Sequence, residues 1–246
     1  MIQFRKIIFF LYGILVYIIT LGTLAYMIGF MGNFLVPNTI DGAQKVGTFQ
    51  AIIINSVLLL IFAIQHSVMA RQSFKKAWTR IIPKPIERST YVLMSCVALL
   101  LLFFFWEPID GMVWNVQSET GVIVLYCIYF LGWSMVFFTT FLISHWDLFG
   151  LRQVYLYLVG RPYTAVDFTV PFFYKKIRHP LYLGFLITFW ATPTMSLTHL
   201  FFSILFTAYV FMAINLEEKD LVYDFKERYV EYKKKVPMIL PIKRKV

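Results

Sequence analysis

The chain has 246 residues, of which 59% are hydrophobic and 15% are charged, and its formal net charge is +10. Soluble domains carry about 25% charged residues, so this composition excludes an ordinary soluble fold. The two cysteines, Cys96 and Cys127, both lie in apolar stretches, which argues against a disulfide framework or a cysteine metal site.

Long apolar runs predict membrane helices along the chain. The first four runs are Ile7–Phe30, Phe49–Ile64, Tyr91–Trp106 and Val122–Ile143. A fifth run, Leu181–Leu216, is uncharged and long enough for two helices, since a bilayer core needs about 20 apolar residues per helix. We expect its turn at Pro193 to Ser196. The first run is too long for a cleaved signal peptide, and no small-residue cleavage pattern follows it.

These runs predict an all-α fold, a polytopic membrane helix bundle with about six spans, the last two forming a helical hairpin. Residues 1–246 are expected to form a single integral membrane domain. With the N-terminus inside, 22 of the 23 lysines and arginines fall in cytoplasmic segments, and only Lys45 falls outside. Positive residues concentrate in cytoplasmic loops. We therefore expect a bacterial inner-membrane protein whose termini and active site are cytoplasmic.

The basic surplus is explained by this orientation and by contact with anionic membrane lipids. It predicts no nucleic-acid partner and no obligate protein partner. Polar clusters mark the cytoplasmic ends of the spans. They are Gln65-His66-Ser67, Ser144 to Gln153, Arg178 to Tyr182, and Glu217 to Asp220. Ionisable groups at membrane depth are costly, which makes these clusters candidate functional sites.

Each cluster also has a purely structural interpretation. His66 could cap its helix, Arg178 could be an ordinary cytoplasmic cation, and Glu217 with Glu218 could be solvated surface charges. Three of the four histidines nevertheless lie in these clusters, whereas His199 lies near the outer turn and is expected to have no catalytic role. The histidines show no metal-ligand spacing such as HxxxH or HExxH, so no metal site is expected.

The C-terminal third carries an ordered series of motifs. The series is Arg178-His179-Pro180-Leu181-Tyr182-Leu183-Gly184, an apolar hairpin, Glu217-Glu218-Lys219-Asp220-Leu221, and then Phe225, Tyr229, Tyr232 and Val236-Pro237. This series resembles the isoprenylcysteine carboxyl methyltransferase and phospholipid N-methyltransferase superfamily, with Lys226 where a glycine is usual. The resemblance implies a site for S-adenosyl-L-methionine, formed by the cytoplasmic loops and tail. The implied cofactor-binding residues are Arg178, His179, Pro180, Tyr182, Glu217 and Glu218, with Tyr229 closing over the adenine.

Segments nearer the N-terminus indicate which branch of the superfamily the chain resembles. Gln65 to Arg71, Glu87 to Tyr91 and His145 to Gln153 resemble the NnrU-like branch, whose members include enzymes that methylate small thiols. The resemblance implies methylation of a small volatile thiol, most closely methanethiol, to give dimethyl sulfide. The alternatives are methylation of a lipid-like substrate, either a prenylcysteine carboxylate or a phospholipid amine, and a non-catalytic membrane transport protein.

A thiol attacks as its thiolate, so the reaction benefits from a base near neutral pH. Histidine has a suitable unperturbed pKa. His66 is the first candidate, and His145, with Asp147 able to orient it, is the second. Arg152 could either steady Asp147 or attract the thiolate.

Overall fold

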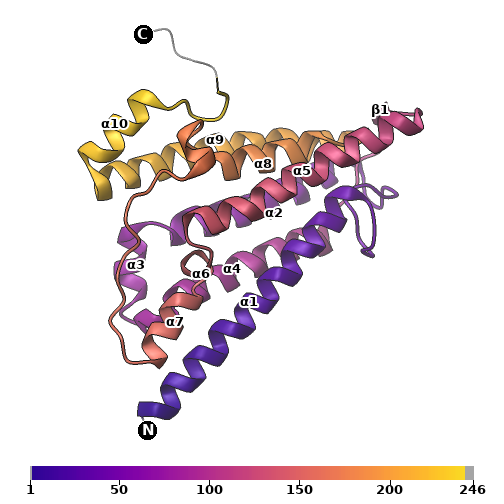
Figure 1. The fold of residues 1–246 in the computed structure, drawn as a ribbon. Coiled ribbons are helices and arrows are strands. Elements are labelled where there is room, and N and C mark those ends of the chain that lie inside the picture. Colours follow the sequence, from indigo (N-terminus) through magenta and orange to yellow (C-terminus); the bar gives the residue numbers. More distant parts are fainter. Residues whose placement is uncertain (1, 242–246) are drawn as a thin grey trace. The chain divides into compact units, whose positions relative to one another are not determined.

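A computed structural model describes residues 2–241, in which the regular elements are helices apart from two short strands (Figure 1). The elements are α1 Ile2–Gly32, α2 Thr48–Met69, α3 Gln72–Trp78, α4 Lys84–Phe105, β1 Met112–Asn115, α5 Glu119–Ile143, α6 His145–Leu148, α7 Leu151–Leu158, the 3₁₀ turn η1 Phe172–Lys175, α8 Pro180–Trp190, β2 Thr194–Ser196, α9 Leu197–Phe225 and α10 Glu227–Lys235. Within residues 2–241, five helices (α1, α2, α4, α5 and α9) are long and apolar enough to cross a membrane. The predicted polytopic helix bundle is confirmed.

These helices extend beyond the apolar runs because each one continues into polar sequence at one or both of its ends. A helix is the form in which a chain satisfies all its backbone hydrogen bonds within lipid. Proline at the first position of α8, Pro180, suits a helix start because its missing N–H has no intrahelical partner there. Ser196 caps α9 by accepting a hydrogen bond from the backbone N–H of His199 at 2.9 Å.

The helices belong to two compact units. The first contains residues up to 110 together with 144–166, and the second contains 111–143 together with 167 onward. The single-domain organisation expected from the sequence remains a prediction.

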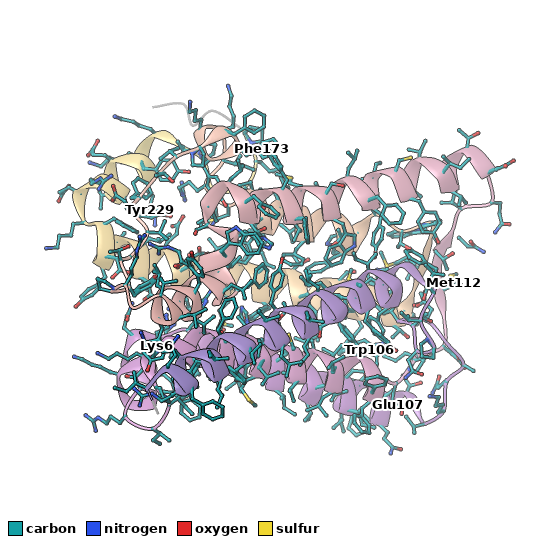
Figure 2. The ribbon with its side chains drawn as sticks, turned by 60° about the horizontal axis from the view of Figure 1, so that its bottom comes forward. Lys6, Trp106, Glu107, Met112, Phe173 and Tyr229 are labelled. Carbon is teal, nitrogen blue, oxygen red and sulfur yellow. The ribbon has the colours of Figure 1, made fainter. Side chains whose placement is uncertain are left out.

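In the first unit, α1 and α4 run parallel to each other. The Tyr12 hydroxyl lies 3.1 Å from Thr90 Oγ1 near the start of both helices, and Phe30 contacts Trp106 near their ends, with ring centroids 6.2 Å apart. Figure 2 shows Lys6 at one end of this unit and Trp106 at the opposite end. The starts of α1 and α4 therefore lie at the end of the unit that carries Lys6.

Helix α2 runs antiparallel to α4 in the same unit. The Asn55 side chain donates to the backbone carbonyl of Glu107 at 2.7 Å and accepts from its N–H at 2.9 Å. Helices α6 and α7 return to the end where α2 finishes. There Gly150, with φ +86°, lies so close to Ser89 of α4 that an added Cβ would be 2.7 Å from the Ser89 nitrogen. Glycine at this position lets the α6–α7 segment sit against α4.

In the second unit, α5 and α8 cross closely and α8 and α9 form the expected hairpin. An added Cβ at Gly184 would lie 2.9 Å from the Gly132 carbonyl oxygen, so the two backbones nearly touch. The carbonyl of Phe189 accepts from Ser203 Oγ at 2.7 Å across the hairpin. The turn between the arms is residues 191–196, as predicted, and its strand β2 pairs antiparallel with β1.

The two arms of the hairpin are unequal in length. Helix α8 has 11 residues, or roughly 16 Å at 1.5 Å per residue, about half of a 30 Å hydrocarbon core. Helix α9 has 29 residues, and it continues two turns beyond Glu217 and Glu218 to Phe225. These two glutamates therefore lie inside α9, just beyond the end of the apolar run.

Candidate active site

The second unit brings Arg178, His179 and Glu218 together in its interior. Arg178 Nε donates to Glu218 Oε1 at 2.7 Å, and His179 Nε2 donates to the same oxygen at 3.0 Å. All three side chains are buried. Arg178 and His179 immediately precede α8, and Glu218 lies on α9, so residues 40 positions apart meet where the hairpin arms come together. A buried charge is tolerated when it is paired and hydrogen-bonded in this way.

The C-terminal tail holds Arg178 and His179 in place. Their backbone N–H groups donate to the carbonyls of Pro237 at 2.9 Å and Met238 at 3.1 Å. Arg178 Nη1 also donates to the carbonyls of Lys233, at 3.2 Å, and Val236. The Arg178 guanidinium therefore makes three donor contacts, one to Glu218 and two to the tail, and it links the tail to α9.

The other residues of the motif surround this cluster. Glu217 Oε2 lies 3.8 Å from His179 Nδ1, and the Tyr182 ring lies 5.7 Å from the His179 ring, centroid to centroid. Tyr229 of α10 is buried, and burial followed by the Glu218 charge raises the pKa of its phenol. Figure 2 shows Tyr229 at the end of this unit that is opposite Met112.

Two buried polar atoms in this region, Glu217 Oε2 and the Tyr229 hydroxyl, have no hydrogen-bond partner among residues 2–241. The second oxygen of Glu218, Oε2, pairs with the partly exposed Lys233 Nζ at 2.5 Å. Carboxylate oxygens suit a ligand that brings amino or hydroxyl donors, and a buried phenol suits a planar ring system with polar edges. The residues present therefore fit a methyl donor of the nucleoside and amino-acid type.

In the first unit, His66 of α2 lies against α4. His66 Nδ1 is 3.0 Å from Ser95 Oγ, and Ser95 Oγ itself donates to the Tyr91 carbonyl at 3.1 Å. With the serine proton used in that bond, Ser95 can accept from Nδ1–H, in the imidazole tautomer that leaves Nε2 as the basic nitrogen. The Tyr91 hydroxyl lies 3.0 Å from Nε2 and 3.1 Å from Nδ1. His66 is half-buried, whereas Ser95 and Tyr91 are buried.

The second base candidate, His145, has a different partner from the one expected. Its Nε2 is 2.7 Å from the Tyr17 hydroxyl of α1, and burial lowers the pKa of the imidazole. Asp147 Oδ1 instead pairs with Arg152 Nη1 at 2.9 Å, and Asp147 Oδ2 accepts from the Tyr163 hydroxyl at 3.1 Å. Asp147 therefore orients Arg152, rather than His145 as the sequence suggested. Asp147 pairs with Arg152 because helix α7 brings the arginine back to the carboxylate.

Arg152 makes further contacts that fix the loop after α7. Its Nη1 donates to the carbonyl of Thr164 at 2.7 Å, and Nη2 donates to Thr164 Oγ1 at 2.7 Å. Burial and the neighbouring Asp147 raise the pKa of Tyr163. Of the two roles considered for Arg152, steadying Asp147 is the one that the contacts show.

Arg88 contacts both the region around His66 and the region around His145. The residue patterns of the sequence alone did not indicate this role. The Arg88 guanidinium lies 4.9 Å from the Tyr91 ring centroid, and its Nε donates to the Leu148 carbonyl of α6 at 2.8 Å. Tyr91 in turn contacts His66. The signal available in the sequence was the Glu87 to Tyr91 segment, which carries both Arg88 and Tyr91 but gives no indication of what they contact.

In the part of the chain that the structure describes, no three His, Cys, Asp or Glu side chains are grouped so that they could hold a metal ion. The fourth histidine, His199, is buried in the α8–α9 hairpin, where its Nε2 lies 3.1 Å from the Phe189 carbonyl oxygen. This position agrees with a structural role.

Comparison with known proteins gives close relatives over nearly the whole chain. A protein named methanethiol S-methyltransferase from Crocosphaera subtropica is 49% identical over 94% of this chain and 91% of its own length. One with the same name from Mycobacterium tuberculosis is 46% identical over 94% of this chain and 95% of its own length. Nurim from Rattus norvegicus is 30% identical over 68% of this chain and 66% of its own length. No family model matches the chain, and no solved structure matches it.

The membrane-crossing helices, the buried Arg178–His179–Glu218 cluster and these relatives together define an integral membrane methyltransferase. The class agrees with the superfamily motifs of the C-terminal third. The chain belongs to the methanethiol S-methyltransferase family.

Proposed function

We propose that this protein transfers a methyl group from S-adenosyl-L-methionine to methanethiol and forms dimethyl sulfide. The observation that carries the proposal is the buried Arg178–His179–Glu218 cluster, which lies in a chain 43–49% identical to four relatives named for this reaction. S-adenosyl-L-methionine supplies, when bound, a methyl carbon attached to a positively charged sulfur.

Residues of the second unit would bind this donor. Glu217 and Glu218 present carboxylate oxygens that can accept hydrogen bonds from an amino group or ribose hydroxyls. His179 and Arg178 hold the Glu218 side chain in a single orientation through two bonds to Oε1. Pro180 starts α8 and so sets the direction in which Tyr182 projects, while Tyr229 supplies an aromatic surface for the adenine. Prepositioned groups lower the entropic barrier to reaction.

His66 is proposed as the proton acceptor. Ser95 holds the Nδ1 proton, so Nε2 can take the proton from the thiol sulfur. The thiolate so formed would be the nucleophile, and S-adenosyl-L-methionine held by Glu217, Glu218, Arg178 and His179 would supply the methyl group. His145 remains the second candidate, and the pair of Asp147 and Arg152 supports the local fold of α6 and α7.

The remaining proposals concern partners and location. We propose a small volatile thiol as the methyl acceptor, membrane lipids as surroundings, no nucleic acid, and no obligate protein partner. We further propose the bacterial inner membrane, with both termini and the active site cytoplasmic, because Lys45 alone among the lysines and arginines falls in an expected outer loop. Labelling of Lys45→Cys in intact cells by a membrane-impermeant thiol reagent supports this topology, and labelling only after the cytoplasm is exposed contradicts it.

Purified protein, S-adenosyl-L-methionine and methanethiol in a sealed vial test the reaction. Headspace gas chromatography should detect dimethyl sulfide in amounts that grow with time and protein concentration. A matched Glu218→Gln sample is the control. Absence of dimethyl sulfide, together with a methylated lipid product when membrane lipids are the only acceptor, would replace the thiol with a lipid-like substrate.

A further inference from the structure

We propose that Lys233 occupies, in the free protein, the place on Glu218 that the amino group of the methyl donor takes on binding, so that binding displaces this lysine. The proposal rests on the proposed function, in which Glu218 helps to hold the donor. It concerns a residue of α10 that no motif singled out.

Three nitrogen-bearing side chains surround Glu218, and they divide between its two oxygens. Arg178 Nε and His179 Nε2 both donate to Oε1, at 2.7 and 3.0 Å. Lys233 Nζ lies 2.5 Å from Oε2 as an ion pair. The two buried cationic side chains therefore hold Oε1, whereas the partly exposed Lys233 neutralises Oε2, the oxygen that an incoming ammonium group could take over.

Lys233 is also the most exposed and least constrained of the three groups. Its side chain is 47% exposed, against 3% for Arg178 and 4% for His179. Arg178 is additionally fixed by the carbonyl oxygens of the tail. A lysine has four rotatable bonds and a strongly hydrated ammonium, so it leaves an ion pair for water at little cost. An arginine that is buried and bonded to several acceptors cannot leave its ion pair at so little cost.

The exchange preserves the charge of the buried site. Glu218 is 2% exposed, and a carboxylate at that depth is costly without a cation beside it. The amino-acid part of the proposed donor carries an α-ammonium group, which has the same charge and the same donor chemistry as the lysine Nζ. Replacing one ammonium by the other keeps Glu218 compensated throughout, and it releases Lys233 to solvent.

The inference predicts opposite effects of one substitution on stability and on affinity. Lys233→Gln removes the internal competitor, so the affinity for S-adenosylhomocysteine, measured by isothermal titration calorimetry, should rise about threefold to tenfold. The ligand-free variant should melt at a lower temperature than the wild type because Glu218 has lost a counter-ion. The matched control is Lys234→Gln, since Lys234 pairs with the exposed Glu231 at 2.7 Å and should alter neither quantity.

A second ligand separates displacement from a general effect on the site. Methylthioadenosine shares the nucleoside but lacks the amino-acid part, so its affinity should be the same in the wild type and in Lys233→Gln. An unchanged or weakened affinity of Lys233→Gln for S-adenosylhomocysteine overturns the inference, and so does an equal gain for both ligands. If wild type and both variants fail to bind S-adenosylhomocysteine, the proposed function itself is refuted.

Discussion

Glu218 is the residue whose replacement tests the site most directly. Its carboxylate pairs with Arg178, whose side chain is only 3% exposed, and it also contacts His179 and Lys233. Glu218→Ala leaves the Arg178 charge buried without its partner, and removing one member of a buried pair costs about 3–5 kcal/mol. For a chain of this size that cost corresponds to a fall of roughly 6–20 °C in melting temperature.

Glu218→Gln is the informative companion variant. Its amide oxygen can still accept from Arg178 Nε and His179 Nε2, but the charge is gone, so about 1.5–3 kcal/mol should be lost, the worth of a hydrogen bond to a charged group. Both variants should lose affinity for S-adenosylhomocysteine, because an amide or a methyl group is a poor partner for an ammonium.

The melting temperature of detergent-solubilised protein, followed by intrinsic fluorescence, should be highest for the wild type, lower for Glu218→Gln and lowest for Glu218→Ala. Glu217→Gln is the control for stability, because its side chain is 43% exposed and its nearest cationic partner is 3.8 Å away. A melting temperature of Glu218→Ala within the range of this control would refute the reasoning, as would wild-type affinity for S-adenosylhomocysteine in both Glu218 variants.

Three further outcomes are expected. His66→Asn should lower turnover at neutral pH by about 10²–10⁴-fold and leave cofactor affinity unchanged. The turnover of this variant should recover partly at alkaline pH, where thiolate is already present. Near wild-type turnover at neutral pH would exclude His66 as the base. Gly184→Ala should lower the melting temperature by the equivalent of about 1–3 kcal/mol, because the new Cβ would lie 2.9 Å from the Gly132 carbonyl oxygen, whereas Gly22→Ala, with nothing within 4 Å, should not. Burial lowers the pKa of His145 below that of the unfolded chain, so the unfolded state takes up the proton first and stability should fall as pH drops below about 6.5; a His145→Gln variant with the same pH dependence would contradict this assignment.

The membrane helices could be predicted from sequence because their cause is local. Each long apolar run must satisfy its own backbone hydrogen bonds in lipid, so run length alone indicated α1, α2, α4, α5 and the α8–α9 hairpin. The turn between α8 and α9 followed from Pro193 and its polar neighbours. The order of motifs along the C-terminal third indicated the superfamily, the segments nearer the N-terminus indicated the branch, and the relatives confirmed the resemblance.

Contacts between side chains could not be predicted in this way, because they depend on how each helix is rotated about its axis and on which neighbour it packs against. Arg178 and Glu218 are 40 residues apart in the sequence. Only the folded hairpin shows that Arg178 and His179 bind the same oxygen of Glu218. The same holds for Asp147, which the return of α7 pairs with Arg152, and for Lys233, which α10 carries back to Glu218. Hydropathy acts along the chain and selects helices, whereas the pairing of buried charges is decided by tertiary structure, since a buried charge is stable only beside the group that the fold brings to it.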